Sequence, residues 1–249
     1  MARKIKRIMN ELKELEESKE ILIQSGIYFH YDEENIEKIN VMFIGPINTP
    51  YEKGFYFFEL TYPEEYPMTP PIMKYCTQGF LTLNNNSNIN KTNNLVKVRF
   101  NPNLYTNGKV CISMLNTWKG PGWVPTNTAS NIFVAIQALV FNEEPLRNEP
   151  GFENSSQTII DTYTKIIEYS NIKTSIIEQF NKDLGQFEMF RNIIKSYIKE
   201  NINIYDTNIE NIIKNKNEIV NSPAYGMNVL LDYKLLKDEY EKFKDIIMN

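Results

Sequence analysis

Histidine and cysteine are scarce in this chain of 249 residues, which contains one histidine, His30, and two cysteines, Cys76 and Cys111. These three residues cannot supply the four ligands of a structural zinc site without unusual help from carboxylates, so no metal site is predicted. A cysteine hydrolase normally pairs its nucleophile with a histidine. His30 falls in the first predicted strand, on the far side of the predicted sheet from Cys111, which disfavours that class of enzyme.

The chain also lacks a long apolar run and a basic charge field. No run of about 18 apolar residues occurs, and the charged N-terminus has no apolar core of signal-peptide length. A net charge of -4 offers no field to hold a nucleic-acid backbone. We therefore expect no membrane segment and no nucleic-acid partner, a cytoplasmic or nuclear location with reduced thiols, and proteins as partners.

Helical periodicity opens the chain. Apolar residues recur on one face: Ile5, Ile8, Met9, Leu12 and Leu15. Charged residues, including Arg3, Lys4 and Arg7, take the other faces. Solvation is the simpler explanation of this basic face, and docking of an acidic partner is the alternative.

Residues 25–75 change to short β-rich runs separated by Gly, Pro and Asn turns. The runs predict an antiparallel meander with strands at Gly26–Tyr31, Lys38–Ile44, Phe55–Tyr62 and Ile72–Tyr75. The segment Tyr66–Pro71 contains three prolines, which remove backbone donors and fix φ. It is therefore predicted to be a rigid loop or edge and not a central strand.

The rest of the chain predicts a loop, a strand and then helices. Leu81–Leu95 is Asn-rich and indicates a surface loop, Val96–Phe100 a short strand, and Thr128–Phe141 a capped helix with one apolar side. Helical spacing dominates after Asn154 and predicts three to five helices, with breaks near Asn171, Asn203 and Ser222-Pro223. We expect a core domain over residues 1–153 and a helical extension over residues 154–249.

The segment Asn101–Trp123 carries the candidate chemistry. Asn103 lies eight residues before Cys111 (111 - 103 = 8), with a turn at Asn107-Gly108 between them. Such a return is expected to bring the Asn103 side chain beside the Cys111 sulfur, where an amide N–H stabilises an oxyanion without exchanging a proton. Acyl transfer through a thioester fits this pair. The alternative is that Cys111 is a small buried residue, as free cysteines commonly are.

Several motifs follow one another in a defined order along the chain. They are an N-terminal helix, a four-stranded meander, Tyr66-Pro67-x-x-Pro70-Pro71, Asn101-Pro102-Asn103, Asn107-Gly108-x-x-Cys111, Trp123-x-Pro125 and a crossover helix. This order resembles the ubiquitin-conjugating enzymes, the E2 family, over roughly Ala2 to Glu153. The resemblance implies an α+β fold, the UBC fold, followed here by the C-terminal helical extension.

The resemblance also implies roles for individual residues. Cys111 stands where the family forms its thioester with ubiquitin or a ubiquitin-like modifier, received from an E1 enzyme that consumes the ATP, so no cofactor is expected. Asn103 matches the oxyanion or loop-stabilising asparagine. Contacts to E1 and to E3 ligases are implied for the first helix and two loops, at Arg3, Lys4, Arg7, Pro67, Met68, Pro70 and Pro125. Met68 replaces an aromatic residue of many E2s that serve HECT ligases, which favours a RING ligase. The modifier passes to a lysine of a protein substrate.

Three departures accompany the resemblance. Asn101 replaces the family's histidine, which removes a ring that braces the loop, and Trp118–Pro121 lies in an insertion expected to form a lip near the site. In the family an acidic residue orients the incoming lysine, and Glu149 is its nearest candidate in this chain. The alternative is that Glu149 is a solvated acid in a loop.

The motifs GKVCISMLNTWKGPGWVP and NEPGFE are similar to those of a large E2 subclass that pairs with the second ubiquitin-activating enzyme. The alternative hypothesis for the function of the chain is a noncatalytic E2 variant that binds ubiquitin.

Overall fold

A four-stranded antiparallel sheet forms the centre of the protein. The computed structural model describes residues 2–82 and 95–248. The strands lie in the order β1 (Ile27–Asp32), β2 (Asn35–Ile44), β3 (Phe55–Thr61) and β4 (Ile72–Tyr75), so each pairs with its neighbour in sequence. The predicted meander is confirmed, and Tyr66–Pro71 lies in the connection between β3 and β4.

Helices pack on the sheet from the N-terminal segment and from the crossover. The chain begins with α1 (Ala2–Glu17) and α2 (Lys19–Gln24), and α1 buries Ile8, Leu12 and Leu15 of the predicted apolar face. The crossover helix α3 (Ala129–Leu139) begins directly after Thr128. Asn131 Oδ1 accepts the Thr128 N–H at 3.0 Å and satisfies a donor at the helix start. Both predicted helices are thus confirmed.

Both faces of β3 are buried. Side chains alternate across a strand, and Phe58 packs toward Phe43, which contacts Phe133 of α3. On the opposite face, Phe57 stacks on Phe187 of the 3-10 helix η4 (Gly185–Phe190), with ring centroids 4.8 Å apart. This double burial explains the continuous apolar run of β3, because neither face meets water.

The C-terminal extension begins as one long helical rod. The helix α4 (Gln157–Ser170) continues through a π-helix, η3 (Asn171–Glu178), into α5 (Gln179–Asn181). The predicted break at Asn171 is wrong. Tyr56 Oη donates to Asn171 Oδ1 at 2.7 Å, and Asn171 Nδ2 donates to Glu52 O at 2.9 Å, so its amide bonds the core and not its own backbone. Gly54 permits this approach, because a Cβ there would lie 1.8 Å from Asn171 Oδ1.

Two further helices and a hairpin follow. The helices α6 (Arg191–Glu200) and α7 (Ile202–Ile212) meet at Asn201, close to the break predicted near Asn203. The break predicted at Ser222-Pro223 lies instead in the turn of a β-hairpin, β7 (Glu218–Asn221) and β8 (Asn228–Leu231), before the last helix α8 (Tyr233–Met248). The extension is therefore not purely helical.

A second hairpin follows the central sheet. The strands β5 (Phe80–Thr82) and β6 (Leu95–Lys97) pair at the two ends of the predicted Asn-rich loop. The middle of that loop lies outside the described residues. The predicted strand Val96–Phe100 starts one residue earlier and ends at Lys97. Two short 3-10 helices, η1 (Ser113–Leu115) and η2 (Pro145–Asn148), complete the core.

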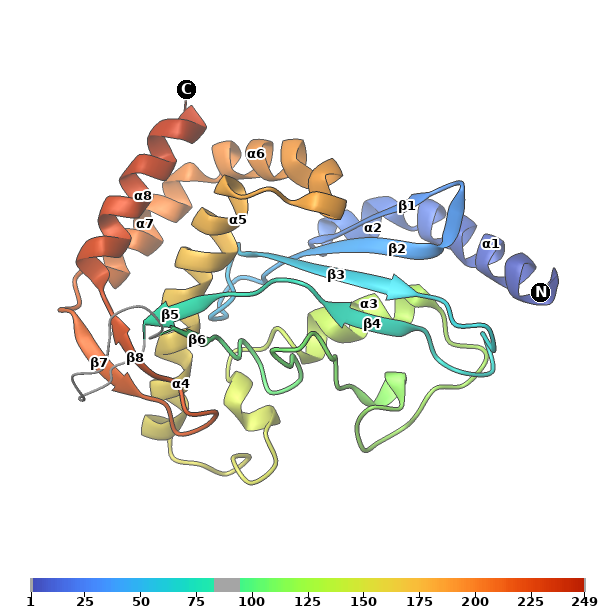
Figure 1. Ribbon diagram of the computed structural model, residues 1–249, viewed down its shortest axis with the longest axis horizontal. Helices are drawn as coiled ribbons and strands as arrows, with labels where there is room; N and C mark the ends of the chain where they lie inside the picture. Colours follow the sequence, from blue (N-terminus) through green and yellow to red (C-terminus); the bar gives the residue numbers. More distant parts are fainter. Residues whose placement is uncertain (1, 83–94, 249) are drawn as a thin grey trace.

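The extension gathers at one end of the sheet. Figure 1 shows α6, α7 and α8 at the end away from α1, with the β7–β8 hairpin beside β5 and β6. β8 packs against β5, and the Arg99 N–H donates to Met227 Sδ at 3.3 Å. The end of the hairpin turn therefore touches the segment that leads into Asn101 and Cys111. None of the helices in the described part of the chain is long and apolar enough to cross a bilayer.

Candidate active site

The loop before the cysteine is braced by a buried asparagine. Asn101 is fully buried, and its Nδ2 donates to Val140 O at 2.7 Å and to Tyr51 Oη at 2.9 Å. Its Oδ1 accepts the Asn103 N–H at 2.8 Å. A primary amide has two N–H donors and one carbonyl oxygen that accepts, so these three hydrogen bonds use both donors and the acceptor of Asn101. Asn101 therefore braces the loop in place of the family's histidine ring, since its amide ties the loop to the end of α3.

Asn103 and Cys111 are joined through their backbone and one side chain. The Cys111 N–H donates to Asn103 O at 2.8 Å, and Asn103 Nδ2 donates to Cys111 O at 2.6 Å. Gly108, at φ +93°, adopts the left-handed conformation that the return between them requires. The spacing thus brings the two residues together, although the amide was expected beside the sulfur. The amide lies on the carbonyl of the cysteine, where it holds the backbone of the loop.

Cys111 itself is 2% exposed. This is the exposure that the packing alternative predicts, so burial alone does not assign the nucleophile. The other cysteine, Cys76, is half-buried, and burial raises the pKa of its thiol to about 11. A thiol with that pKa is a poor nucleophile at neutral pH.

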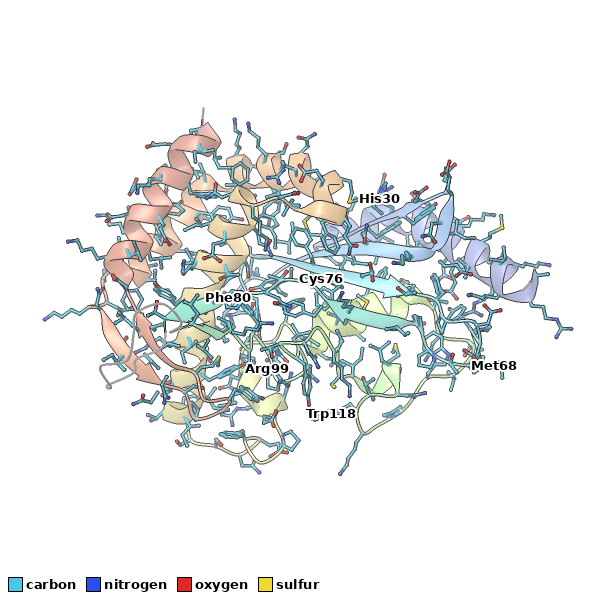
Figure 2. All side chains as sticks on the ribbon, viewed as in Figure 1. His30, Met68, Cys76, Phe80, Arg99 and Trp118 are labelled. Atoms are coloured by element: carbon cyan, nitrogen blue, oxygen red, sulfur yellow. The ribbon has the colours of Figure 1, made fainter. Side chains whose placement is uncertain are left out.

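The only histidine lies across the sheet from Cys111. Lys74 of β4 bridges to Lys109, so the segment that leads to Cys111 runs along the β4 edge, whereas His30 lies in β1 at the opposite edge. Figure 2 shows His30 and Trp118 on opposite sides of the sheet in this view. A histidine-activated cysteine hydrolase is therefore incompatible with this arrangement.

A cavity of about 330 Å³ opens between the segment after the cysteine and α3. It is lined by Asn103, Ile112, Ser113, Met114, Trp118, Ala135, Ala138, Leu139, Asn142 and Asn148. Trp118, from the predicted lip insertion, lies on the rim formed by the cysteine segment. Because Asn103 and Ile112 contribute to the wall, the cavity adjoins the segment that carries Cys111.

The residues Asn148 and Glu149 close another side of the site. Asn148 Nδ2 donates to Asn103 Oδ1 at 2.9 Å and to Leu139 O at 3.0 Å, which docks η2 against the Asn103 loop and α3. The next residue, Glu149, is partly buried, and its Oε2 accepts a hydrogen bond from Tyr225 Oη. A carboxylate is thus fixed beside the loop that carries Asn103.

The predicted partner-binding segments meet around a buried acid in the interior of α1, Glu11. Glu11 is 2% exposed, and its carboxylate accepts from Arg7 Nε at 2.6 Å, from Tyr66 Oη, and from the Ala129 N–H at 3.0 Å. The last bond places negative charge at the N-terminus of α3, where the helix dipole favours it. Burial, then the Glu11 carboxylate, raise the pKa of Tyr66, so the phenol stays protonated and donates.

The same cluster decides which predicted contact residues face water. Arg7 Nη2 donates to Asn127 O at 2.7 Å, and Lys4, 5% exposed, pairs with Glu37 at 2.8 Å, so both cations have partners within the protein. The exposed members of the predicted set are Arg3, Met68 and Pro125, with Pro67 and Pro70 partly buried. Trp123 Nε1 donates to Pro67 O at 2.8 Å and holds the two loops together.

Comparison with known proteins identifies the family of this chain. The ubiquitin-conjugating enzyme family matches residues 7–169. This chain belongs to that family. It is 34% identical to ubiquitin-conjugating enzyme E2 Z of Xenopus tropicalis over 182 residues, covering 73% of this chain and 53% of that protein. Human E2 Z is 31% identical over 212 residues, or 85% of this chain and 55% of that protein, so the chain spans about half of each relative.

Two other similar proteins extend the comparison. The human dual E2 ubiquitin-conjugating enzyme/E3 ubiquitin-protein ligase BIRC6 is 34% identical over 187 residues, which cover 72% of this chain and 4% of that protein. A solved structure, the E2 domain of a Toxoplasma gondii ubiquitin conjugating enzyme, has 21% identity and a TM-score of 0.45, over 68% of this chain and 97% of that one.

Sequence reasoning missed two residues beside the site, Arg99 of the core and Tyr225 of the extension. Arg99 precedes the Asn-Pro-Asn motif but carries no motif of its own, and Tyr225 lies in the turn of an unpredicted hairpin. Only the presence of Asn148 next to Glu149 in the NEPG motif pointed toward this side of the site. No group of three or more metal-ligating side chains occurs within residues 2–82 and 95–248.

Proposed function

We propose that this chain is an active E2 enzyme, which carries ubiquitin or a ubiquitin-like modifier on Cys111 and passes it to a lysine of a protein substrate. The observation that supports this most is the pair of bonds that hold Asn103 and Cys111 together, at 2.8 and 2.6 Å, in a member of the ubiquitin-conjugating family. In this proposal Cys111 is the nucleophile, and the two bonds brace the loop that carries it.

The chemistry is two successive acyl transfers. The Cys111 thiolate attacks the thioester carbonyl on an E1 enzyme, a new S–C bond forms, and the E1 thiolate leaves. A neutral lysine amine then attacks the carbonyl, and the Cys111 thiolate leaves in its turn. The amine, with a free pKa of about 10.4, must lose its proton to react. Glu149 is the acid proposed to orient it and accept that proton, and Asn103 keeps the loop rigid throughout.

The proposed contacts with the remaining partners are based on which of the predicted residues are exposed. We propose that Arg3, Met68 and Pro125, which face water, contact the E1 and a RING ligase, whereas Lys4 and Arg7 shape that surface from within. The insertion around Trp118 supports assignment to the large E2 subclass that the second ubiquitin-activating enzyme charges. ATP is consumed by that E1, so the chain needs no cofactor of its own, and it acts in the cytoplasm or nucleus.

Because the sequence contains only two cysteines, substitution of each in turn shows which one carries the modifier. The chain is incubated with each of several E1 enzymes, ATP and ubiquitin, and a thiol-sensitive adduct is sought on a non-reducing gel. We expect the wild type and Cys76→Ala to form it and Cys111→Ala to form none. An adduct that survives Cys111→Ala, or a wild type that no E1 charges, would contradict the proposal.

The alternative is a noncatalytic E2 variant that binds ubiquitin as a scaffold. It predicts ubiquitin binding without an adduct, and the same gel separates it from the active enzyme. The retained Cys111 and its bonds to Asn103 favour the active enzyme.

A further inference from the structure

The turn of the β7–β8 hairpin, residues 222–227, contacts residues that flank the proposed active site. Tyr225 stands in this turn with φ +62°, a conformation that non-glycine residues rarely adopt. Its ring packs edge-to-face on Tyr163 at 6.1 Å, and its Oη donates to Glu149 Oε2. A residue of the extension thus binds the carboxylate proposed to meet the lysine.

The same tyrosine also covers the arginine that holds the catalytic loop. The Arg99 guanidinium lies between two rings, 3.6 Å from the centroid of Tyr105 and 4.8 Å from that of Tyr225. Its Nε donates to Asn101 O at 3.1 Å and its Nη2 to Pro102 O at 2.7 Å. The stacked cation therefore fixes two carbonyls directly before Asn103. Figure 2 shows Arg99 on the same side of the sheet as Trp118 in this view.

These contacts form a closed cycle of interactions that passes through the Asn103 loop. Tyr225 binds Glu149, the neighbouring Asn148 donates to Asn103 at 2.9 Å, and Arg99 ties the Asn103 loop back to Tyr225. Burial, then the hydrogen bond to Glu149, raise the pKa of Tyr225, so its phenol keeps its proton and remains a donor. The structure shows no other residue of the extension that bonds Glu149 within the described chain.

We propose that Tyr225 is a positioning residue for transfer to lysine: it fixes Glu149 through Oε2 and leaves Oε1 for the incoming amine. This inference rests on the proposed E2 function. A hydrogen bond from the neutral phenol restrains rotation of the carboxylate, so the transfer geometry is prepared before the lysine binds. Charging by E1 involves no lysine and is independent of this contact.

The test uses the full chain, charged with ubiquitin and then separated from E1. Tyr225→Phe keeps the ring on Arg99 and Tyr163 and removes only the hydroxyl. We expect normal charging and about a tenfold slower discharge to free lysine, the loss typical of a removed hydrogen bond to a charged group. Discharge to hydroxylamine, which is largely unprotonated at neutral pH and needs no carboxylate, should keep the wild-type rate.

A matched control and a double variant complete the test. Tyr240→Phe removes another hydroxyl of the extension, one that donates to Asp206 at 2.9 Å away from the site, and should discharge to lysine at the wild-type rate. Glu149→Gln should reproduce the selective loss, and the double variant Tyr225→Phe/Glu149→Gln should lose no more than Glu149→Gln alone, because both act through one contact.

Several results would overturn the inference. Tyr225→Phe that discharges to lysine like the wild type, that slows lysine and hydroxylamine equally, or that loses activity while Glu149→Gln does not, removes Tyr225 from positioning. A wild-type chain that no E1 charges would overturn the E2 function together with this role. Normal charging combined with any of the first three results overturns the role of Tyr225 alone.

Discussion

At the scale of single residues, Asn103 uses both ends of its amide. Nδ2 donates to Cys111 O and Oδ1 accepts from Asn148 Nδ2, so the side chain links the cysteine to the segment that carries Glu149. Either contact could be the one that transfer requires. A substitution that keeps one end of the amide and removes the other separates them.

We expect Asn103→Ala to be charged by E1 and to discharge to lysine at least about tenfold more slowly, because the loop loses its link to the Cys111 carbonyl. Asn103→Asp keeps an acceptor for Asn148 and loses the donor, and should be equally slow. Single-turnover discharge measures both rates. The exposed Asn203→Ala serves as the control. Wild-type discharge by Asn103→Ala would exclude the residue from the chemistry.

At the scale of elements, the buried Glu11 joins α1, the Pro-rich connection and the start of α3. Its partners come from three segments: Arg7 from α1, Tyr62 and Tyr66 from the connection after β3, and Ala129 from α3. The geometry of the proposed E1 and E3 surface therefore depends on one carboxylate that is only 2% exposed.

Glu11→Gln should lower the free energy of unfolding by about 3 kcal/mol, since it leaves Arg7 without its buried counter-charge. Glu17→Gln is the matched control, because Glu17 pairs with Lys13 at the same i,i+4 spacing on the exposed side of α1, at 3.7 Å. Such a pair contributes less than about 0.5 kcal/mol. Urea unfolding measures both, and equal midpoints for Glu11→Gln and wild type would contradict the role of the cluster.

At the scale of the whole molecule, the extension packs against one face of β3 at one end of the central sheet. Phe57 stacks on Phe187, Phe55 packs edge-to-face on Tyr197 at 5.9 Å, and Tyr205 Oη donates to Lys53 O at 2.8 Å. Core and extension therefore share apolar area and hydrogen bonds along β3. Their boundary at residue 153 stays a prediction from the sequence.

Deletion of residues 154–249 should destabilise the core, because Phe55 and Phe57 alone then lose about 1.5–3 kcal/mol each of burial. That loss is large against a total stability of about 5–15 kcal/mol. We expect the truncated chain to unfold at a lower temperature and to associate through the uncovered face. Thermal unfolding and size-exclusion chromatography measure these effects. A monomeric truncated chain with an unchanged melting temperature would show that the core is independent.

Local patterns in the sequence predicted the central fold well. The strands and α3 follow from alternation, turn residues and the Thr128 cap, all of which act between near neighbours. The strand predicted at Val96–Phe100 ends early, at Lys97, and the larger errors lie in the extension. Asn171 was expected to end a helix, but its amide finds partners on Tyr56 and Glu52, which a local pattern cannot contain.

The sequence by itself determined the pairing of Asn103 with Cys111, because eight residues and a glycine turn impose it locally, and it determined the family through the order of its motifs. Only the tertiary structure decided that Lys4 is buried and that Tyr225 bonds Glu149. The physical reason is the range of the interactions. A turn is set by the dihedral angles of adjacent residues, whereas a contact across the fold depends on where every intervening element packs.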